Sequence, residues 1–134
     1  MRNRLVIVVL AVAVGLLISV PLFAHHGSAA FDRGKTVTLK GTVKEWIYTN
    51  PHLLLTLDVK GEDGKVVTWV VETQSPQVMY PSGYRKDSFK HGDQVTIVAE
   101  PVKNGLPVGR IIEAVLADGT KLLRIRDDGP PPPQ

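Results

Sequence analysis

The chain contains no cysteine, which excludes disulfides, a lipid carried on a thiol and thiolate ligands for a metal. It also lacks a strong excess of one charge, because 16 lysine and arginine residues stand against 13 aspartate and glutamate residues. The basic residues are spread singly instead of being gathered in a patch. The electrostatic signature of nucleic-acid binding is therefore missing, and we expect no nucleic-acid partner.

The motifs of the common catalytic sites are missing as well. The sequence shows no serine, histidine and acid spacing typical of a hydrolase, no cysteine nucleophile and no glycine-rich phosphate loop. Glu45, Asp58 and Glu72 fall on expected strands, but nothing in the sequence brings two of them together. We therefore expect a non-catalytic binding module and not an enzyme.

The longest apolar run lies at the start of the chain. Two arginines, Arg2 and Arg4, precede the apolar residues Leu5 to Val20, and Ala24 closes the short segment that follows. This order is typical of a secretory signal peptide, so we expect residues 1–24 to be removed and the protein to be periplasmic or secreted. An uncleaved membrane anchor is the alternative, because the run approaches the lower limit of about 17 residues for a span.

Beyond residue 24, apolar and polar residues alternate with a period of two. The alternation predicts strands near 37–48, 53–59, 66–72, 95–99, 110–116 and 121–125. A change of phase near Glu45, together with Gly41, indicates a bent or bulged first strand. Ser75 and Pro76 predict the start of a short helix after the third strand.

This order predicts an all-β fold, namely a small five- to six-stranded Greek-key barrel that resembles the oligonucleotide/oligosaccharide-binding (OB) fold. A short helical segment lies between the third and fourth strands, and a small β-sandwich is the alternative. The expected organisation is an N-terminal lead-in at 25–34, a barrel domain at 35–126 and a disordered proline-rich tail at 127–134. Phe31 is expected to anchor the lead-in to the core.

Several short motifs resemble those of a family of small exported bacterial proteins of unknown function. The most specific are the His-His start and the Asn-Pro-His turn. The full set is His25-His26-Gly27-Ser28, Phe31-Asp32, Gly41-Thr42-Val43, Thr49-Asn50-Pro51-His52, Trp69 to Glu72, Ser75-Pro76, Gly92-Asp93 and Asn104-Gly105. The resemblance implies an exported β-barrel of this fold, and it implies no particular activity, substrate or cofactor.

The histidines carry the clearest chemical lead. Cleavage after Ala24 would make His25 the first residue, with a free amine and an imidazole that together chelate a divalent metal. We predict a site for copper or another divalent metal formed by His25 and His26, with His52 as a third ligand. Glu72 and Asp32 are candidate oxygen ligands, whereas His91 lies in a polar loop and is excluded.

Two plainer interpretations of these histidines stay open. A pair of histidines at a chain end is often only a solvated terminus, and His52 can simply hydrogen-bond its own turn. Reach is a further condition, because residues 25–34 extend over about 33–36 Å at most. The lead-in must fold back along the barrel if His25 and His26 are to meet His52.

The alternative function does not involve a metal. Barrels of this type bind ligands across their second and third strands and the adjoining loops. Trp46, Tyr48 and Asn50 would then form a surface for a peptide, a glycan or a partner protein, whereas Trp69 is expected to belong to the core.

Overall fold

The computed structural model describes residues 27–124 and shows six strands and three short helical segments. The predicted signal peptide and proline-rich tail lie outside these residues. No helix of the described part is long and apolar enough to span a bilayer. The elements are η1 (Ser28–Ala30), β1 (Val37–Ile47), β2 (Leu53–Lys60), β3 (Val66–Thr73), α2 (Pro76–Met79), η2 (Tyr80–Ser82), β4 (Gln94–Pro101), β5 (Val108–Val115) and β6 (Lys121–Leu123).

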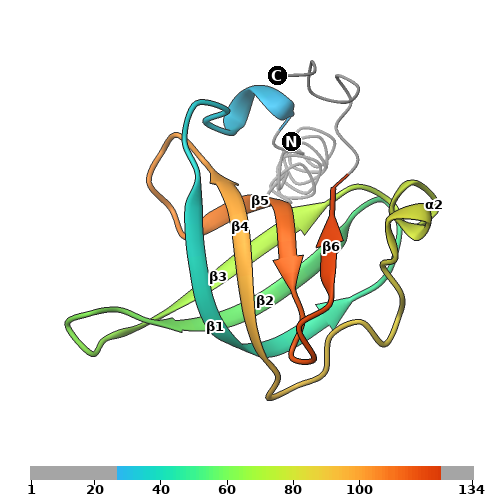
Figure 1. Cartoon of the computed structure of the whole chain (residues 1–134). Coiled ribbons are helices and arrows are strands. Elements are labelled where there is room, and N and C mark those ends of the chain that lie inside the picture. Colours follow the sequence, from blue (N-terminus) through green and yellow to red (C-terminus); the bar gives the residue numbers. More distant parts are fainter. Residues whose placement is uncertain (1–26, 125–134) are drawn as a thin grey trace, which may run out of the picture.

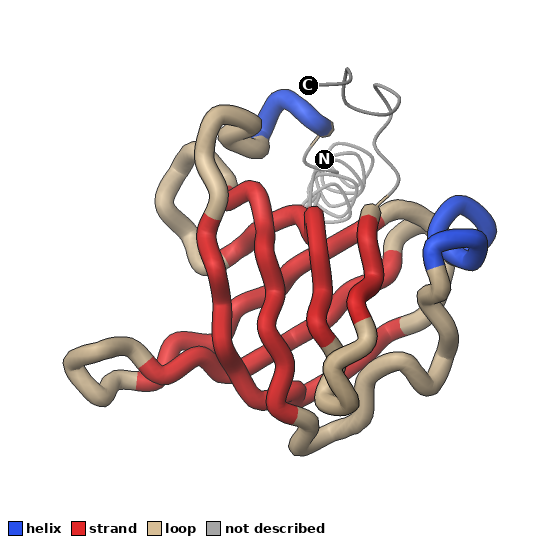
Figure 2. The backbone as a smooth tube through the Cα atoms, viewed as in Figure 1, coloured by secondary structure: helices blue, strands red, loops and turns tan. Residues whose placement is uncertain are grey.

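The strands form a closed barrel with one additional strand (Figures 1 and 2). Their order is β3-β2-β1-β4-β5-β6, and a parallel pairing of β3 with β5 closes the ring. This closing pairing joins residues 70–72 to residues 108–110, and β6 extends the sheet beyond β5. The predicted OB-like barrel is thus confirmed, and the β-sandwich alternative is excluded. The short helix α2 lies between β3 and β4, as expected.

The bend of β1 lies where the sequence placed it. The register of β1 with β2 shifts between Val43 and Glu45, which is the predicted bulge. Gly41 lies earlier in β1, where the two strands approach closely. A Cβ atom at this position would lie 2.7 Å from the carbonyl oxygen of Asp58 and 2.8 Å from Cδ1 of Leu57. Glycine therefore lets β1 coil across β2 without steric conflict.

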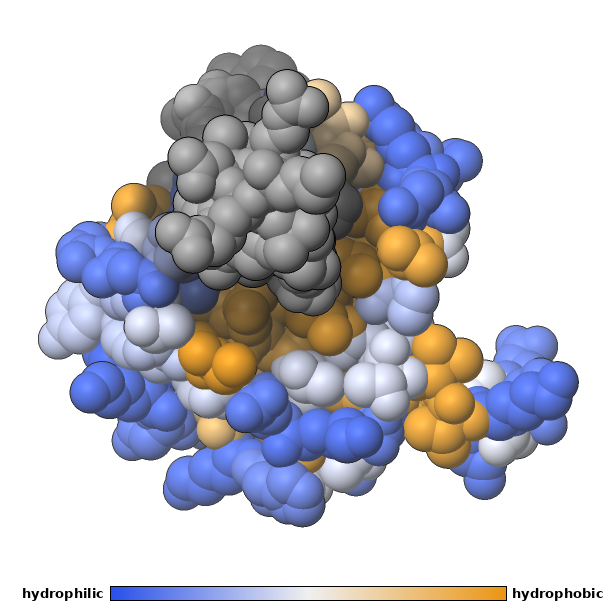
Figure 3. Space-filling model, turned by 180° about the vertical axis from the view of Figure 1, so that it is seen from behind, coloured by the Kyte–Doolittle hydropathy of each residue, from blue (hydrophilic) through white to orange (hydrophobic). Residues whose placement is uncertain are grey.

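The β2–β3 hairpin projects beyond the barrel wall (Figures 1 and 2). Val66 and Val67 lie on this projection and are 59% and 44% exposed. Apolar side chains gather at the base of the hairpin (Figure 3). The prediction that Val67, Trp69 and Val71 share a face agrees with the pairing, but only Val71 is fully buried because the hairpin extends past the core.

The core fills the barrel and extends under the linker that follows η2. Inward-facing residues of β4 are buried as predicted, namely Val95, Ile97 and Ala99. Tyr84 and Phe89, which lie in the linker, belong to the same core cluster. The linker sequence has no apolar periodicity that would have predicted this burial. The fifth strand runs over 108–115 and not over the predicted 110–116, because its pairing with β3 begins at Val108.

The buried phenol of Tyr84 gives a first prediction. Within residues 27–124 its hydroxyl has no hydrogen-bond partner. Burial raises the pKa of Tyr84, and the positive charge of Arg124 offsets part of this rise. We expect Tyr84→Phe to raise the free energy of unfolding by about 1 kcal/mol at neutral pH, because an unsatisfied buried hydroxyl is removed. Urea unfolding curves of both proteins would measure this change.

The pH dependence follows from the direction of the same shift. The unfolded chain releases the tyrosine proton more easily than the folded chain, so wild-type stability falls as the pH rises above about 10. Tyr84→Phe should lack this part of the alkaline loss. A destabilised Tyr84→Phe variant at neutral pH would contradict the assignment of an unsatisfied hydroxyl.

Candidate metal site

The lead-in folds back onto the barrel at the end of β4. Phe31 forms a β-bridge with Val102 and is only 2% exposed, so the predicted anchor is confirmed. The backbone N–H of Asp32 donates to the carbonyl of Pro101 at 2.8 Å, and that of Lys103 donates to Ala30 at 3.0 Å. These contacts hold the described part of the lead-in against one end of the barrel.

A buried group of charges lies beneath this contact. Nε and Nη2 of Arg110 donate to the same oxygen of Glu100, Oε2, at 3.0 Å and 2.7 Å. Nη1 of Arg124 lies 3.7 Å from that oxygen. The guanidinium carbon of Arg110 also lies 4.9 Å from the centre of the Phe31 ring. The sequence did not predict this group. The alternation of β4 places Glu100 on the face away from the inward residues, and a charged residue on that face is expected to contact water.

His52 stands directly before β2 and pairs with an acidic residue of β3. Its Nδ1 lies 3.3 Å from Oε2 of Glu72, and both side chains are partly exposed. Histidines that bind metals commonly donate one ring N–H to a carboxylate, which fixes the tautomer and directs the other nitrogen to the metal. In the neutral tautomer that donates from Nδ1 to Glu72, the lone pair of the ring lies on Nε2. Glu72 thus fits a supporting role better than the predicted role of direct ligand.

The strand register places His52 and the lead-in at the same end of the barrel. Glu72 of β3 pairs with Arg110 of β5, and Arg110 contacts Phe31 of the lead-in. Adjacent strands are about 4.8 Å apart, so two strand spacings separate Arg110 from β2. The described part of the lead-in therefore lies against the end of β4, and the approach of His25 and His26 to His52 stays a prediction.

The described residues do not complete a metal site by themselves. Among residues 27–124, no three histidine, aspartate or glutamate side chains lie close enough together to hold an ion. His25 and His26, the predicted primary ligands, lie outside the described residues.

The predicted aromatic surface is used largely in packing. Nε1 of Trp46 donates to the carbonyl of Arg85 at 3.0 Å, and its ring centre lies 4.8 Å from that of Phe89. The hydroxyl of Tyr48 donates to the carbonyl of Tyr84 at 3.4 Å. Both rings are half-buried against the core, because the linker after η2 covers them. A Trp46→Ala substitution would disturb this packing, so a loss of partner binding in this variant would not show that Trp46 contacts the partner.

Asn50, the third residue of that predicted surface, is exposed in the turn between β1 and β2. It is joined to Pro51 by a cis peptide bond. It lies two positions from both Tyr48 and His52 in the sequence.

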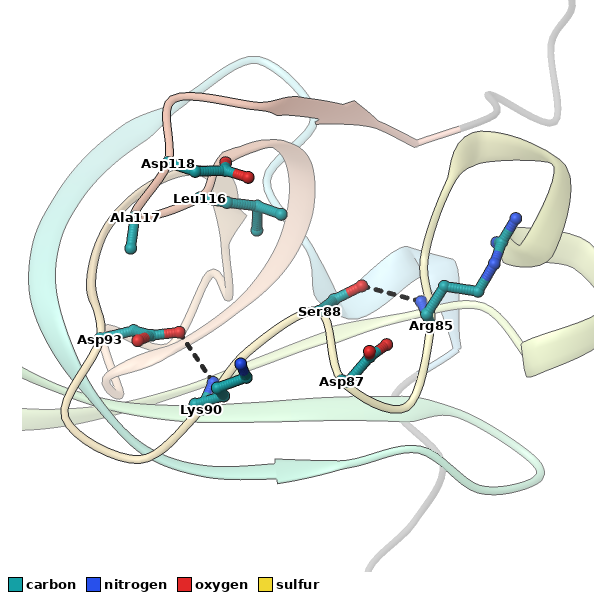
Figure 4. Close-up of a pocket in the computed structure, with 8 residues that line it drawn as sticks. All are labelled: Arg85, Asp87, Ser88, Lys90, Asp93, Leu116, Ala117 and Asp118. Atoms are coloured by element: carbon teal, nitrogen blue, oxygen red, sulfur yellow. Dashed lines mark hydrogen bonds between the residues drawn. The ribbon is translucent and has the colours of Figure 1, made fainter.

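A separate hollow of about 290 Å³ lies between the linker after η2 and the β5–β6 turn (Figure 4). Two of its carboxylates are used in closing turns: Asp93 accepts from the N–H of Lys90 at 2.9 Å, and Asp118 accepts from the N–H of Thr120 at 2.8 Å. The hydrogen bonds from Thr120 lower the pKa of Asp118. Arg85 points away from Asp93 and Asp118 in Figure 4, and its guanidinium carbon lies 3.6 Å from the centre of the Tyr80 ring. We therefore do not assign the hollow as the functional site.

Comparison with solved structures finds a mitochondrial single-stranded DNA-binding protein from S. cerevisiae. It is 14% identical and has a TM-score of 0.45, and the alignment covers 61% of this chain and 92% of that chain. This likeness supports no functional argument. No curated protein matches the sequence. Residues 14–111 match the profile of a family of unknown function, DUF6152. Because this match covers most of the sequence, the chain belongs to the DUF6152 family.

Proposed function

We propose that the protein is an exported, non-catalytic metal-binding module that holds copper or another divalent ion at its N-terminal histidines. The primary ligands are the amine and imidazole of His25 and the side chain of His26, and the imidazole of His52 is the third group. Nitrogen donors of this kind suit copper(II) in preference to harder cations. The cysteine-free composition directs the choice to nitrogen ligands, because no thiolate is available.

The His52–Glu72 pair is the observation that carries this proposal. It supplies an oriented imidazole at the barrel end to which the lead-in is attached. A histidine that only closed its turn would not need a carboxylate from a neighbouring strand. The metal therefore has one ligand supported by the barrel and others brought by the lead-in.

Copper titration of the exported protein tests the proposal. Mass spectrometry first establishes that the chain begins at His25. Copper(II) is then expected to bind with one equivalent and to produce a visible absorption band. Acetylation of the His25 amine should weaken binding by at least about tenfold, because an acetylated nitrogen is no longer a ligand for copper(II).

Two single substitutions separate the roles of the other histidines. His52→Ala should weaken copper(II) binding about tenfold, which is the usual effect of losing one supported contact. His91→Ala is the matched control, because His91 is exposed in a distant turn, and it should leave the affinity unchanged. Absence of any tight binding or visible band would overturn the metal function. Unchanged affinity after acetylation of the His25 amine would exclude the terminal amine as a ligand.

We also infer that nucleic acid is not a ligand. The support is the nearly balanced charge, which falls to about +1 once residues 1–24 are removed. A single-stranded oligonucleotide belongs in the same titrations as a negative control, and salt-sensitive binding of it would contradict this inference.

A further inference from the structure

One edge of the projecting β2–β3 hairpin has no neighbouring strand within residues 27–124. β3 pairs with β2 along its whole length, but its pairing with β5 on the other side covers only residues 70–72. Residues 66–69 therefore have one paired edge and one open edge. The hairpin carries this open edge away from the barrel wall (Figures 1 and 2).

The open edge presents backbone donors and acceptors to solvent. The N–H of Val70 points away from β2, because it donates to the carbonyl of Pro107 at 3.0 Å. Alternate residues of an antiparallel strand direct their N–H and C=O groups to the same side. The backbone groups of Val66 and Thr68 therefore point to the open edge, where no strand of the described chain pairs with them.

The sequence of the open edge does not protect it. Exposed edges are usually shielded by proline, by charged side chains or by a bulge. The run from Val66 to Val71 contains neither proline nor charge, and its register with β2 is unbroken. Val66 and Val67 are exposed, and apolar side chains gather at the base of the hairpin (Figure 3). An edge of this kind is suited to the addition of a strand from another chain.

We propose that the open edge pairs with the same edge of a second copy of the protein, antiparallel about a two-fold axis between the two Val67 residues. In this register, Val66 of each copy lies opposite Thr68 of the other. All the open N–H and C=O groups of both residues then find partners. Moving the axis to Thr68 would instead require the backbone groups of Val70, which already pair with β5.

The side chains of the open edge are complementary to themselves in this register. The two Val67 side chains meet at the axis as a non-hydrogen-bonded pair, with Cα atoms about 4.5 Å apart. Lys65 of each copy lies opposite Trp69 of the other, on the same face as Val67. An ammonium group beside an indole ring is a favourable cross-strand contact.

The length of the hairpin matches the length of the open edge. Gly64 of one copy lies opposite Val70 of the other, where pairing with β5 begins. The strand of the second copy thus reaches its own turn at the point where the open edge ends. An unrelated extended peptide has no reason to end there, so the match favours a second copy.

Charge supports the same occupant. The hairpin turn carries Glu62 and Asp63, and in this register it approaches the β4–β5 turn of the other copy. That turn carries Lys103 and the exposed Leu106, and it lies on the same side of the barrel as the hairpin (Figure 1). Acidic and basic turns therefore face each other twice in the dimer, as an isologous contact requires.

Cysteine cross-linking tests the register directly, because the chain has no cysteine of its own. Val67→Cys places two thiols opposite each other at the axis, at a Cα separation within the range of a disulfide. In Val66→Cys the two thiols are displaced by two residues along the strands and lie beyond the limit of about 7 Å. Under mild oxidation, we expect Val67→Cys to form a disulfide dimer at least about tenfold faster than Val66→Cys.

Val78→Cys is the second control for cross-linking. Its position is 41% exposed, against 44% for Val67, but it lies on α2 and outside the open edge. It should cross-link as slowly as Val66→Cys. Equal rates for the three variants would indicate random collision, and a faster rate for Val66→Cys would indicate another register. Either result would overturn the proposal.

Sedimentation equilibrium measures the association of the wild-type protein. The paired segment is short, so we expect a weak dimer with a Kd on the order of 0.1–1 mM. Val67→Lys places like charges opposite each other at the axis and should weaken the dimer at least about tenfold. Val78→Lys adds the same charge at a similarly exposed position and should leave the Kd unchanged.

Two further results would contradict a dimer at the open edge. One is an equal effect of Val67→Lys and Val78→Lys. The other is a wild-type protein that stays monomeric at millimolar concentration; if it then binds a synthetic β-strand peptide of unrelated apolar sequence, the edge belongs to a different partner. All measurements are made in EDTA, which excludes dimers bridged by histidine-bound metal. The inference therefore stands or falls independently of the proposed metal function.

Discussion

Replacing Glu100 with glutamine is expected to lower the free energy of unfolding by about 3–5 kcal/mol. Glu100 is 2% exposed, and its Oε2 contacts both Arg110 and Arg124. Glutamine has nearly the same shape, but it leaves the two buried guanidinium groups beside a neutral amide. The loss is large because one partner of a buried ion pair is removed while the opposite charges stay. Urea unfolding followed by circular dichroism measures this change.

Glu113→Gln is the matched control for this substitution. Glu113 pairs with Lys121 at 3.6 Å, and the lysine is largely exposed. Exposed pairs of this kind contribute about 0–1 kcal/mol, so the control should unfold close to the wild type. A loss of unfolding free energy of similar size in both variants would show that the burial of Glu100 does not determine how much it contributes to stability.

Valine at position 41 is expected to destabilise the barrel by about 3 kcal/mol, at the upper end of the usual range for overpacking. The reason is the contact between β1 and β2, where a Cβ atom would meet the backbone oxygen of Asp58 at 2.7 Å. A backbone atom in a paired strand cannot turn aside as a flexible side chain can. The two strands must therefore separate where β1 coils.

Thermal unfolding measures the effect of Gly41→Val, and about 3 kcal/mol corresponds to a fall in Tm of roughly 12–24 °C for a domain of this size. Gly34→Val is the control, because the nearest atom to its Cβ, Oδ1 of Asp32, lies at an ordinary 3.6 Å. It should change Tm by only a few degrees. A Gly41→Val variant as stable as Gly34→Val would show that the strands absorb the extra atoms.

The local part of the fold was predictable from residue patterns. Alternation located the strands, and the change of phase near Glu45 located the bulge, because inward and outward positions differ in polarity along a barrel wall. Closure through β3 and β5 could be expected only from the general order of elements. The projection of the β2–β3 hairpin was not expected, since Val66 and Val67 resemble core residues in sequence.

The candidate site was predictable only in its donor atoms. His52 stood out by residue type and by its Asn-Pro-His turn, but its partner Glu72 is 20 positions away. Arg110 and Glu100 were missed because a charged residue in an alternating strand ordinarily faces water. Trp46 and Tyr48 were expected to be exposed, and the structure packs them under a linker whose sequence has no period. Such contacts depend on which distant segments the barrel brings together.

The closure of the barrel has a consequence for how the molecule folds. Each half, β1 to β3 and β4 to β6, is a meander of neighbouring antiparallel strands that can form from local contacts. Among the strands of residues 27–124, only the β1–β4 and β3–β5 pairings join the halves, and the second of these spans just three residues on each strand. Non-local pairings must meet the entropy of loop closure before they contribute stability. Docking of the two meanders is therefore the expected rate-limiting event, and the short β3–β5 seam is expected to form last.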